Sequence, residues 1–190
     1  MRVTDDRYSR DRQRFDLAMR MILHEARTCT IRAWTGLSDD RIRKLYRSYV
    51  ASHGTHLKRH RGKAPTQTAY FMRNADARRH TAGLAGLFAI LGLLEQAARD
   101  QHPGGTLAAL RWGELFCRTY ETYAAFYRSQ RLSFEHASHL LHLLRRSAEL
   151  RPGRCPTCDS YMVVDVLRPA HAVCTWCETD GRRSGAAADA

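Results

Sequence analysis

The sequence predicts a mainly α-helical protein that ends in a small zinc-ribbon-like β module with four cysteine ligands. Two observations lead to this fold class: apolar residues recur at helical spacing through most of the first 150 residues, and two Cys-x-x-Cys pairs lie near the end. A chain of 190 residues can bury one sizeable core and carry one small appended unit. We expect a helical domain over residues 1–150, a four-cysteine zinc-binding module over 151–181 and a flexible tail over 182–190.

Fifteen residues separate the two cysteine pairs, which is a typical spacing for a four-thiolate zinc site. We expect a strand over 163–167 and a second short strand around 171–173, so that one hairpin brings the pairs together. Four thiolates leave no coordination position for water or substrate, so we predict one structural Zn²⁺ rather than a catalytic ion. The predicted ligands are Cys155, Cys158, Cys174 and Cys177.

Two other roles for these cysteines are less consistent with the sequence. A pair of disulfides needs an oxidising compartment, and the first residues contain no apolar signal-peptide core. A redox Cys-x-x-Cys is expected beside a βαβ unit, whereas the residues upstream are helical in pattern. The most apolar run, residues 82–94, is shorter than the roughly 18 residues that cross a bilayer. We therefore favour zinc and expect a cytoplasmic protein without a membrane span.

The N-terminal region has the pattern of a helix-turn-helix. A first helix is expected over about residues 11–27, and a second, short helix should end at Gly36, where a tight turn needs a left-handed backbone. Ser38 is placed to cap the next helix, whose first turn holds Asp39 and Asp40 near its positive dipole end. Such a pattern is also common in all-α domains that bind no DNA.

Positive charge is concentrated in the first part of the chain. The net charge is +12; residues 1–80 hold 19 Lys or Arg against 8 Asp or Glu, and residues 81–190 hold 12 against 11. This asymmetry indicates an acidic partner, nucleic acid first, although solvated helix faces and loops also carry such charges. The candidate DNA contacts are Arg41, Arg43, Lys44 and Arg47 on the second helix of the motif, and Lys58, Arg59, Arg61 and Lys63 in the loop after it.

Further helices are expected downstream. A turn or short helix that carries aromatic core residues should follow Pro65, and an apolar helix over residues 80–99 should be buried on more than one side. A long helix is expected over 106–129, and Ser133 should cap a last helix before a joint at 151–153.

The sequence lacks three kinds of enzyme motif: the phosphate-binding glycine loop, Gly-x-Ser-x-Gly and His-Glu-x-x-His. Cys29 and Cys117 lie within helical patterns and are expected to be buried small residues. Histidines 136, 139 and 142 have three-residue spacing but no thiol or carboxylate to complete a metal site. We expect a protein that is not an enzyme.

Three features together resemble the FlhC family, subunits of the bacterial flagellar master transcriptional regulator. They are the stretch 41–47 (RIRKLYR), the stretch 62–72 (GKAPTQTAYFM) and the terminal Cys-x-x-Cys pairs, and the likeness covers roughly residues 11–180. By this resemblance, the four cysteines named above match the zinc ligands of the family.

The resemblance also implies partners and an activity. FlhC works with FlhD in a complex of four FlhD and two FlhC chains, binds DNA upstream of flagellar promoters, and activates transcription by the housekeeping RNA polymerase holoenzyme. The alternative hypothesis is a zinc-ribbon adaptor that binds protein or RNA without site-specific DNA recognition.

Overall fold

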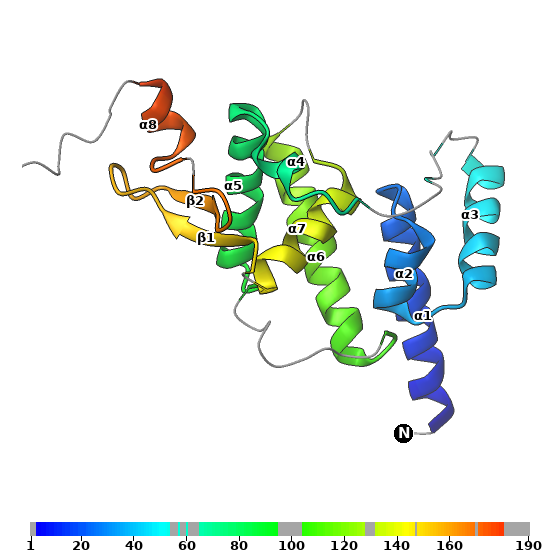
Figure 1. The fold of residues 1–190 in the computed structure, drawn as a ribbon. Coiled ribbons are helices and arrows are strands. Elements are labelled where there is room, and N and C mark those ends of the chain that lie inside the picture. The colour runs from blue at the N-terminus through cyan, green and yellow to red at the C-terminus, as the bar shows by residue number, and fades with distance from the viewer. Residues whose placement is uncertain are drawn as a thin grey trace, which may run out of the picture.

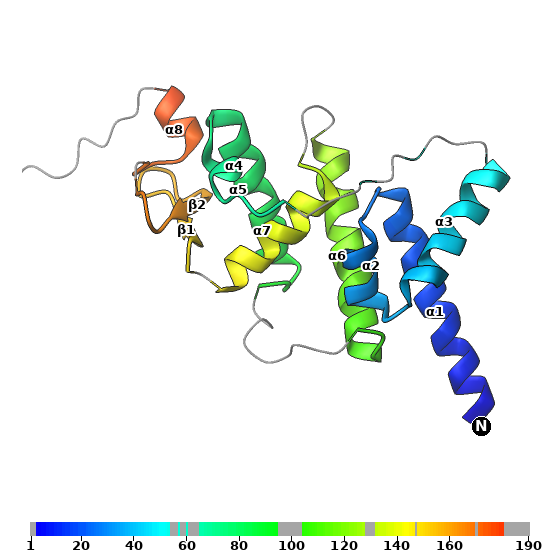
Figure 2. The ribbon, with the colours of Figure 1, turned by 45° about the vertical axis from the view of Figure 1, so that its right-hand side comes forward.

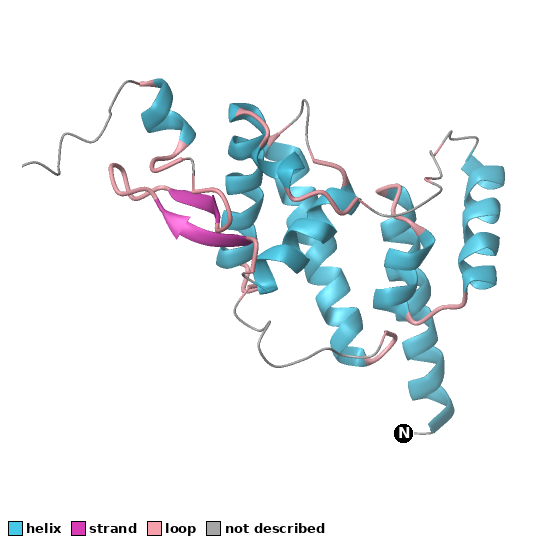
Figure 3. Cartoon of the chain, viewed as in Figure 1, coloured by secondary structure: helices cyan, strands magenta, loops and turns pink. Residues whose placement is uncertain are grey.

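The computed structural model describes residues 3–53, 57, 60, 65–94, 104–127, 132–146, 148–169 and 171–180. Within them the protein is mainly helical, with one two-stranded antiparallel sheet near the C-terminus, so the predicted fold class is confirmed (Figures 1 and 3). None of the described helices is long and apolar enough to cross a membrane. The elements are α1 (Val3–Leu23), α2 (Thr28–Thr35), α3 (Asp39–His53), α4 (Ala69–Met72), α5 (Ala75–Ile90), α6 (Leu107–Phe126), α7 (Phe134–Arg146), β1 (Leu150–Arg154), β2 (Tyr161–Asp165) and α8 (Thr175–Thr179).

The first helix differs from its predicted range of 11–27 at both ends. It already begins at Val3, and it ends at Leu23. The chain turns there because Glu25 adopts a left-handed backbone with φ of 57° and the amide of Ala26 donates to the carbonyl of Met21 at 3.0 Å. The apolar pattern continues through this turn to the buried Ala26, which is why the sequence alone placed the end too late.

The helix-turn-helix pattern is confirmed as a local structure. Gly36 has φ of 66° and donates its amide to the carbonyl of Arg32 at 2.9 Å, which ends α2. Ser38 Oγ accepts from the amide of Arg41 at 3.4 Å at the start of α3. A Cβ at position 36 would lie 2.5 Å from the carbonyl oxygen of Gly104. The turn therefore requires glycine both for its backbone and for close packing.

The central helices begin at residues that cap them. Asn74 Oδ1 accepts from the amide of Ala77 at 2.8 Å, so α5 starts before the predicted residue 80. The same helix ends at Ile90, ahead of Gly92, which has φ of 76°; residues 95–99 of the predicted range lie outside the described residues. Thr106 caps α6, which ends at Phe126 rather than at the predicted 129. The predicted Ser133 cap of α7 is confirmed.

A single main core joins these helices. Its largest fully buried side chains are aromatic and come from α4, α5, α6 and α7: Phe71, Phe88, Phe116, Tyr123 and Phe134. Aromatic rings of this size supply much of the apolar area that a domain of this length removes from water. In both ribbon views α3 lies at one end of this helical body and the sheet with α8 lies at the other (Figures 1 and 2).

Two carboxylates tie the N-terminal helices to the central ones. Glu135 of α7 is only 6% exposed and accepts from the amide of Arg27 at 2.7 Å and from Thr30 Oγ1 at 2.9 Å. It thereby satisfies donors at the start of α2, for which Arg27 supplies no side-chain cap. Glu121 of α6 accepts two hydrogen bonds from Arg20 of α1, at 2.8 and 2.6 Å.

The Arg20–Glu121 pair predicts a specific acid sensitivity. The hydrogen bonds from Arg20 lower the pKa of Glu121 to about 2. A depressed pKa stabilises the fold above the ordinary carboxyl pKa of about 4.3, and this contribution is lost as the pH falls toward 2. Glu121→Gln should lower the free energy of unfolding at pH 7 by about 1 kcal/mol, a modest value because the carboxylate is partly exposed.

Urea unfolding followed by circular dichroism at pH 7 and pH 3 measures this effect. The difference between Glu121→Gln and the native chain should shrink at the lower pH. Asp16→Asn is the matched control, because Asp16 forms an exposed pair with Arg12 at 3.8 Å and should change stability by less than about 0.5 kcal/mol. If Glu121→Gln lowered the free energy of unfolding equally at pH 7 and pH 3, the lowered pKa of Glu121 would be contradicted.

Candidate metal centre

The two strands form a hairpin that brackets the first cysteine pair. β1 and β2 are antiparallel, with Arg154 opposite Tyr161 at the end nearest the connecting loop. A strand does form at Tyr161–Asp165, shifted by two residues from the predicted 163–167, but residues 171–173 form no strand. The prediction of a hairpin between the two cysteine pairs was therefore wrong, because β2 pairs with β1 instead. β2 ends at Asp165, where the carboxylate accepts from the amides of Leu167 and Arg168 and turns the chain.

The hairpin loop turns the sulfur atoms of Cys155 and Cys158 toward the same position. The amide of Asp159 donates to the carbonyl of Cys155 at 2.9 Å, and Asp159 has φ of 57°, which reverses the chain within a few residues. The amide of Cys155 donates to the carbonyl of Ser160 at 2.9 Å and closes the loop. This tight turn is the backbone shape that a metal-binding knuckle requires, because both sulfurs must face the ion.

The second cysteine pair is the start of a helix rather than the end of a strand. Cys174 is the N-cap residue of α8 and makes no side-chain capping bond, so its sulfur is free to point toward the hairpin. Cys177 follows within the first turn of α8 and is 3% exposed. The amide of Cys174 donates to Cys155 Sγ at 3.3 Å, which joins the two pairs directly.

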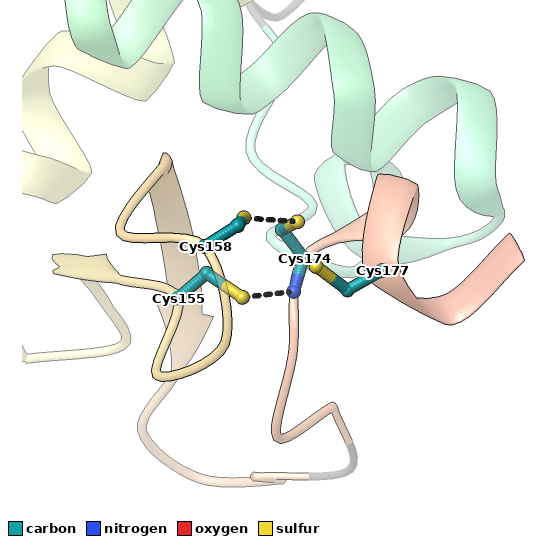
Figure 4. Close-up of side chains that lie close together, drawn as sticks. All are labelled: Cys155, Cys158, Cys174 and Cys177. Atoms are coloured by element: carbon teal, nitrogen blue, oxygen red, sulfur yellow. Dashed lines mark hydrogen bonds between the residues drawn. The ribbon is translucent and has the colours of Figure 1, made fainter. Parts of the chain in front are cut away.

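The four sulfur atoms lie within 4.8 Å of one another (Figure 4). Sγ of Cys158 and Sγ of Cys174 are 3.5 Å apart, and all the cysteines of the chain are free thiols. Zn–S bonds of about 2.3 Å in a tetrahedron place neighbouring sulfurs about 3.8 Å apart, so the observed cluster fits an ion of this kind. The four predicted ligands thus converge, and the donor set can hold one metal ion.

Hydrogen bonds shift the pKa values of the clustered cysteines in opposite directions: the contact with Cys158 raises the pKa of Cys177 to about 12, whereas the pKa values of Cys155 and Cys158 are lowered. Burial opposes ionisation of Cys155, but amide donors from Cys174, Thr157 and Cys158 lower its pKa to about 6. The pKa of Cys158 is also lowered, first by the hydroxyl of Ser160 at 2.6 Å. Thiolates are the form that binds zinc, so these donors prepare two ligands in advance.

The module is packed onto the helical body, not joined to it by a free linker. The predicted joint at residues 151–153 lies inside β1, and Leu150 and Val163 belong to the main core. On the other side Arg78 of α5 forms an ion pair with Glu178 of α8. The sheet and α8 are therefore held against α5 from two directions.

The sequence analysis missed two residues that lie beside the cysteine cluster. Ser160 lies between the sulfurs, with its hydroxyl 2.6 Å from Cys158 Sγ and 3.7 Å from Cys174 Sγ. The sequence did offer a signal for Ser160, because it lies two residues after Cys158. Trp176 is 60% exposed and lies under the guanidinium of Arg79, 5.3 Å from the ring centre. No sequence signal links the tryptophan to this arginine, because the two are far apart in the chain.

The other candidate residues are partly described. All four cations predicted on α3 are exposed: Arg41, Arg43, Lys44 and Arg47. The four in the loop, Lys58, Arg59, Arg61 and Lys63, lie outside the described residues.

The remaining cysteines and histidines do not add to the centre. Cys117 is buried as predicted, but Cys29 is exposed, which corrects the expectation for that residue. His136 stacks on Tyr70 with ring centres 4.0 Å apart, and no metal-binding cluster among the described residues includes it.

The sequence matches no protein-family model, and a search of curated proteins returned no match. The interpretation of the chain therefore rests on its own residues and on their geometry.

Loss of one ligand should release the metal. Cys155→Ser and Cys174→Ser should each reduce bound metal from one ion per chain to well below one half, because three thiolates and a hydroxyl bind zinc far more weakly. Elemental analysis of the purified chain measures the ion and its identity. Cys29→Ser is the control and should retain one full equivalent, since Cys29 is exposed and outside the cluster. Full metal content in both ligand variants would refute the site.

Proposed function

We propose that this chain is a DNA-binding subunit of a transcriptional activator of the FlhC type, in which the metal is a structural Zn²⁺. It acts in a cytoplasmic complex with FlhD, four FlhD with two of these chains, on promoters of flagellar operons with the housekeeping RNA polymerase holoenzyme. The single observation that carries the proposal is a helix-turn-helix whose second helix exposes four cations at one end of the molecule.

The packing of α3 supports its role as the recognition helix. Ile31, Leu37 and Ile42 are buried and hold α2 and α3 together through the turn. The opposite side of α3 is exposed to solvent. A recognition helix needs such an exposed side in order to enter the major groove. α3 packs mainly on α1 and α2, so the body of the protein lies behind it (Figure 2).

The charges of α3 are available to DNA to different degrees. Arg43 is paired with Asp40 at 2.9 Å, and the guanidinium of Arg41 lies 5.7 Å from the ring centre of Phe15. Lys44 and Arg47 are also exposed, and Arg47 Nε donates to the carbonyl of Arg43 at 3.4 Å. Exposed ion pairs such as that of Arg43 are weak, about 0–1 kcal/mol, so phosphate contact can replace them at small cost.

The metal centre supports a structural role and not a catalytic one. Four protein thiolates fill a tetrahedral site, which leaves no position for an activated water. The zinc would hold the hairpin and α8 together, and the proposed activity is binding rather than catalysis.

Binding to promoter DNA tests this proposal. With FlhD present, the chain should bind duplex DNA from upstream of a flagellar operon more tightly than random DNA of equal length. Lys44→Ala and Arg47→Ala should each weaken binding, by up to about tenfold, and reduce the slope of log K against log salt concentration by about 1 per lost phosphate contact. Fluorescence anisotropy across a salt series measures both quantities.

The matched control is Arg146→Ala, because Arg146 is an exposed arginine at the end of α7, far along the chain from the helix-turn-helix. Its affinity and salt slope should equal those of the native chain. Equal affinity of the native complex for promoter and random DNA would reject site-specific recognition and favour the adaptor that binds protein or RNA.

A further inference from the structure

The four cysteines of the metal centre differ in how far solvent reaches them. Cys155, Cys174 and Cys177 are only 2%, 6% and 3% exposed, whereas Cys158 is an exposed residue. Cys158 lies in the loop of the hairpin, where residues 156–159 are all exposed. A reagent dissolved in water therefore reaches Cys158 before it reaches the other three ligands.

A second sulfur lies close to that of Cys158. Sγ of Cys174 is 3.5 Å away, and the two side chains come from different elements (Figure 4). A disulfide joins its sulfurs at about 2.05 Å, so the two atoms need to approach by about 1.5 Å to form one. Cys174 makes no side-chain capping bond to α8, and neither residue belongs to the pairing of β1 with β2. The bond can therefore form without opening the sheet.

The surroundings favour Cys174 over Cys155 as the partner of Cys158. Cys155 Sγ is buried and already accepts the amide of Cys174 at 3.3 Å. The hydroxyl of Ser160 lies between the other two sulfurs, 2.6 Å from Cys158 Sγ and 3.7 Å from Cys174 Sγ. This hydroxyl is placed to donate a hydrogen bond to a group that leaves when the two sulfurs join.

We propose that Cys158 is a site of oxidation by hydroperoxides, which leads to a disulfide with Cys174 and to loss of the metal. In the first step the Cys158 thiolate attacks an oxygen of hydrogen peroxide. The S–O bond forms, the O–O bond breaks and hydroxide leaves, so that the sulfur becomes a sulfenic acid.

In the second step the Cys174 thiolate attacks the sulfur of this sulfenic acid. The S–S bond forms, the S–O bond breaks and a second hydroxide leaves. Together the two sulfurs lose two electrons and the peroxide gains two, and two protons from the solvent convert both hydroxides into water.

The disulfide leaves only Cys155 and Cys177 as thiolate ligands. Two thiolates are too few to retain zinc in a four-thiolate site, so the bound ion would be released. The new bond still connects the hairpin loop to the start of α8, which keeps the two cysteine pairs together. Because thiols can reduce the disulfide again, the centre is a reversible switch between a metal-bound and a disulfide-bound form.

Peroxide treatment of the zinc-loaded chain, freed of reductant, tests this proposal. A coloured chelator should detect release of about one equivalent of zinc. Proteolytic cleavage before Asp165 separates the two cysteine pairs, so mass spectrometry without reduction should find their peptides linked. Dimedone, which traps sulfenic acids, should instead label Cys158 and prevent the link. Dithiothreitol with added zinc should restore one full equivalent.

Cys29→Ser is the matched control, because Cys29 is also exposed but lies outside the cluster. It should release zinc at the rate of the native chain. Zinc that stays bound in peroxide, a disulfide within either pair, or dimedone on a ligand other than Cys158 would overturn the proposal. Loss of the response in Cys29→Ser would overturn it too. These measurements need neither FlhD nor DNA, so their outcome is independent of the proposed function.

Discussion

The convergence of four sulfur atoms is the constraint on which the C-terminal module, residues 150–180, depends. The small cluster around the site contains only Cys155, Met162, Cys174 and Cys177 as buried members among the described residues, so the module has almost no aliphatic core of its own. A structural zinc ion can contribute on the order of 10 kcal/mol to folding, more than so few apolar contacts supply. The hairpin is anchored to the main core through Leu150 and Val163, whereas α8 depends on the sulfurs and on a few contacts with α5.

Those contacts give the metal centre an importance beyond its own module. α8 carries Trp176 onto α5, where Arg79 lies over the indole ring. Residues distant in sequence therefore meet where α8 packs on α5. An ion held by the four cysteines would in this way stabilise the packing of α8 on α5 as well as the hairpin.

The molecule also separates its charged and neutral surfaces. α3 lies at one end of the helical body, and the sheet with α8 lies at the other (Figure 1). The first end carries the exposed cations of α3, whereas at the second end Arg78 and Arg79 of α5 are paired with carboxylates. Between them, Glu121 and Glu135 tie the N-terminal helices to α6 and α7. If the proposed function holds, such an arrangement would let the chain contact DNA at one end without obstructing a protein partner at the other.

The sequence by itself determined the fold class, the four cysteines that cluster, the turn at Gly36 and the cap at Ser133, because each depends on local spacing or on a backbone that few residues adopt. It did not determine where the strands lie. Val163 fits a strand in either arrangement, and only pairing with residues 150–154 decides the register. The start of α2 and the packing of α8 on α5 were also decided by tertiary structure, since Glu135 and Trp176 contact residues about 100 positions away. Contacts of that range leave no periodic signal in the sequence, because they depend on how whole helices pack.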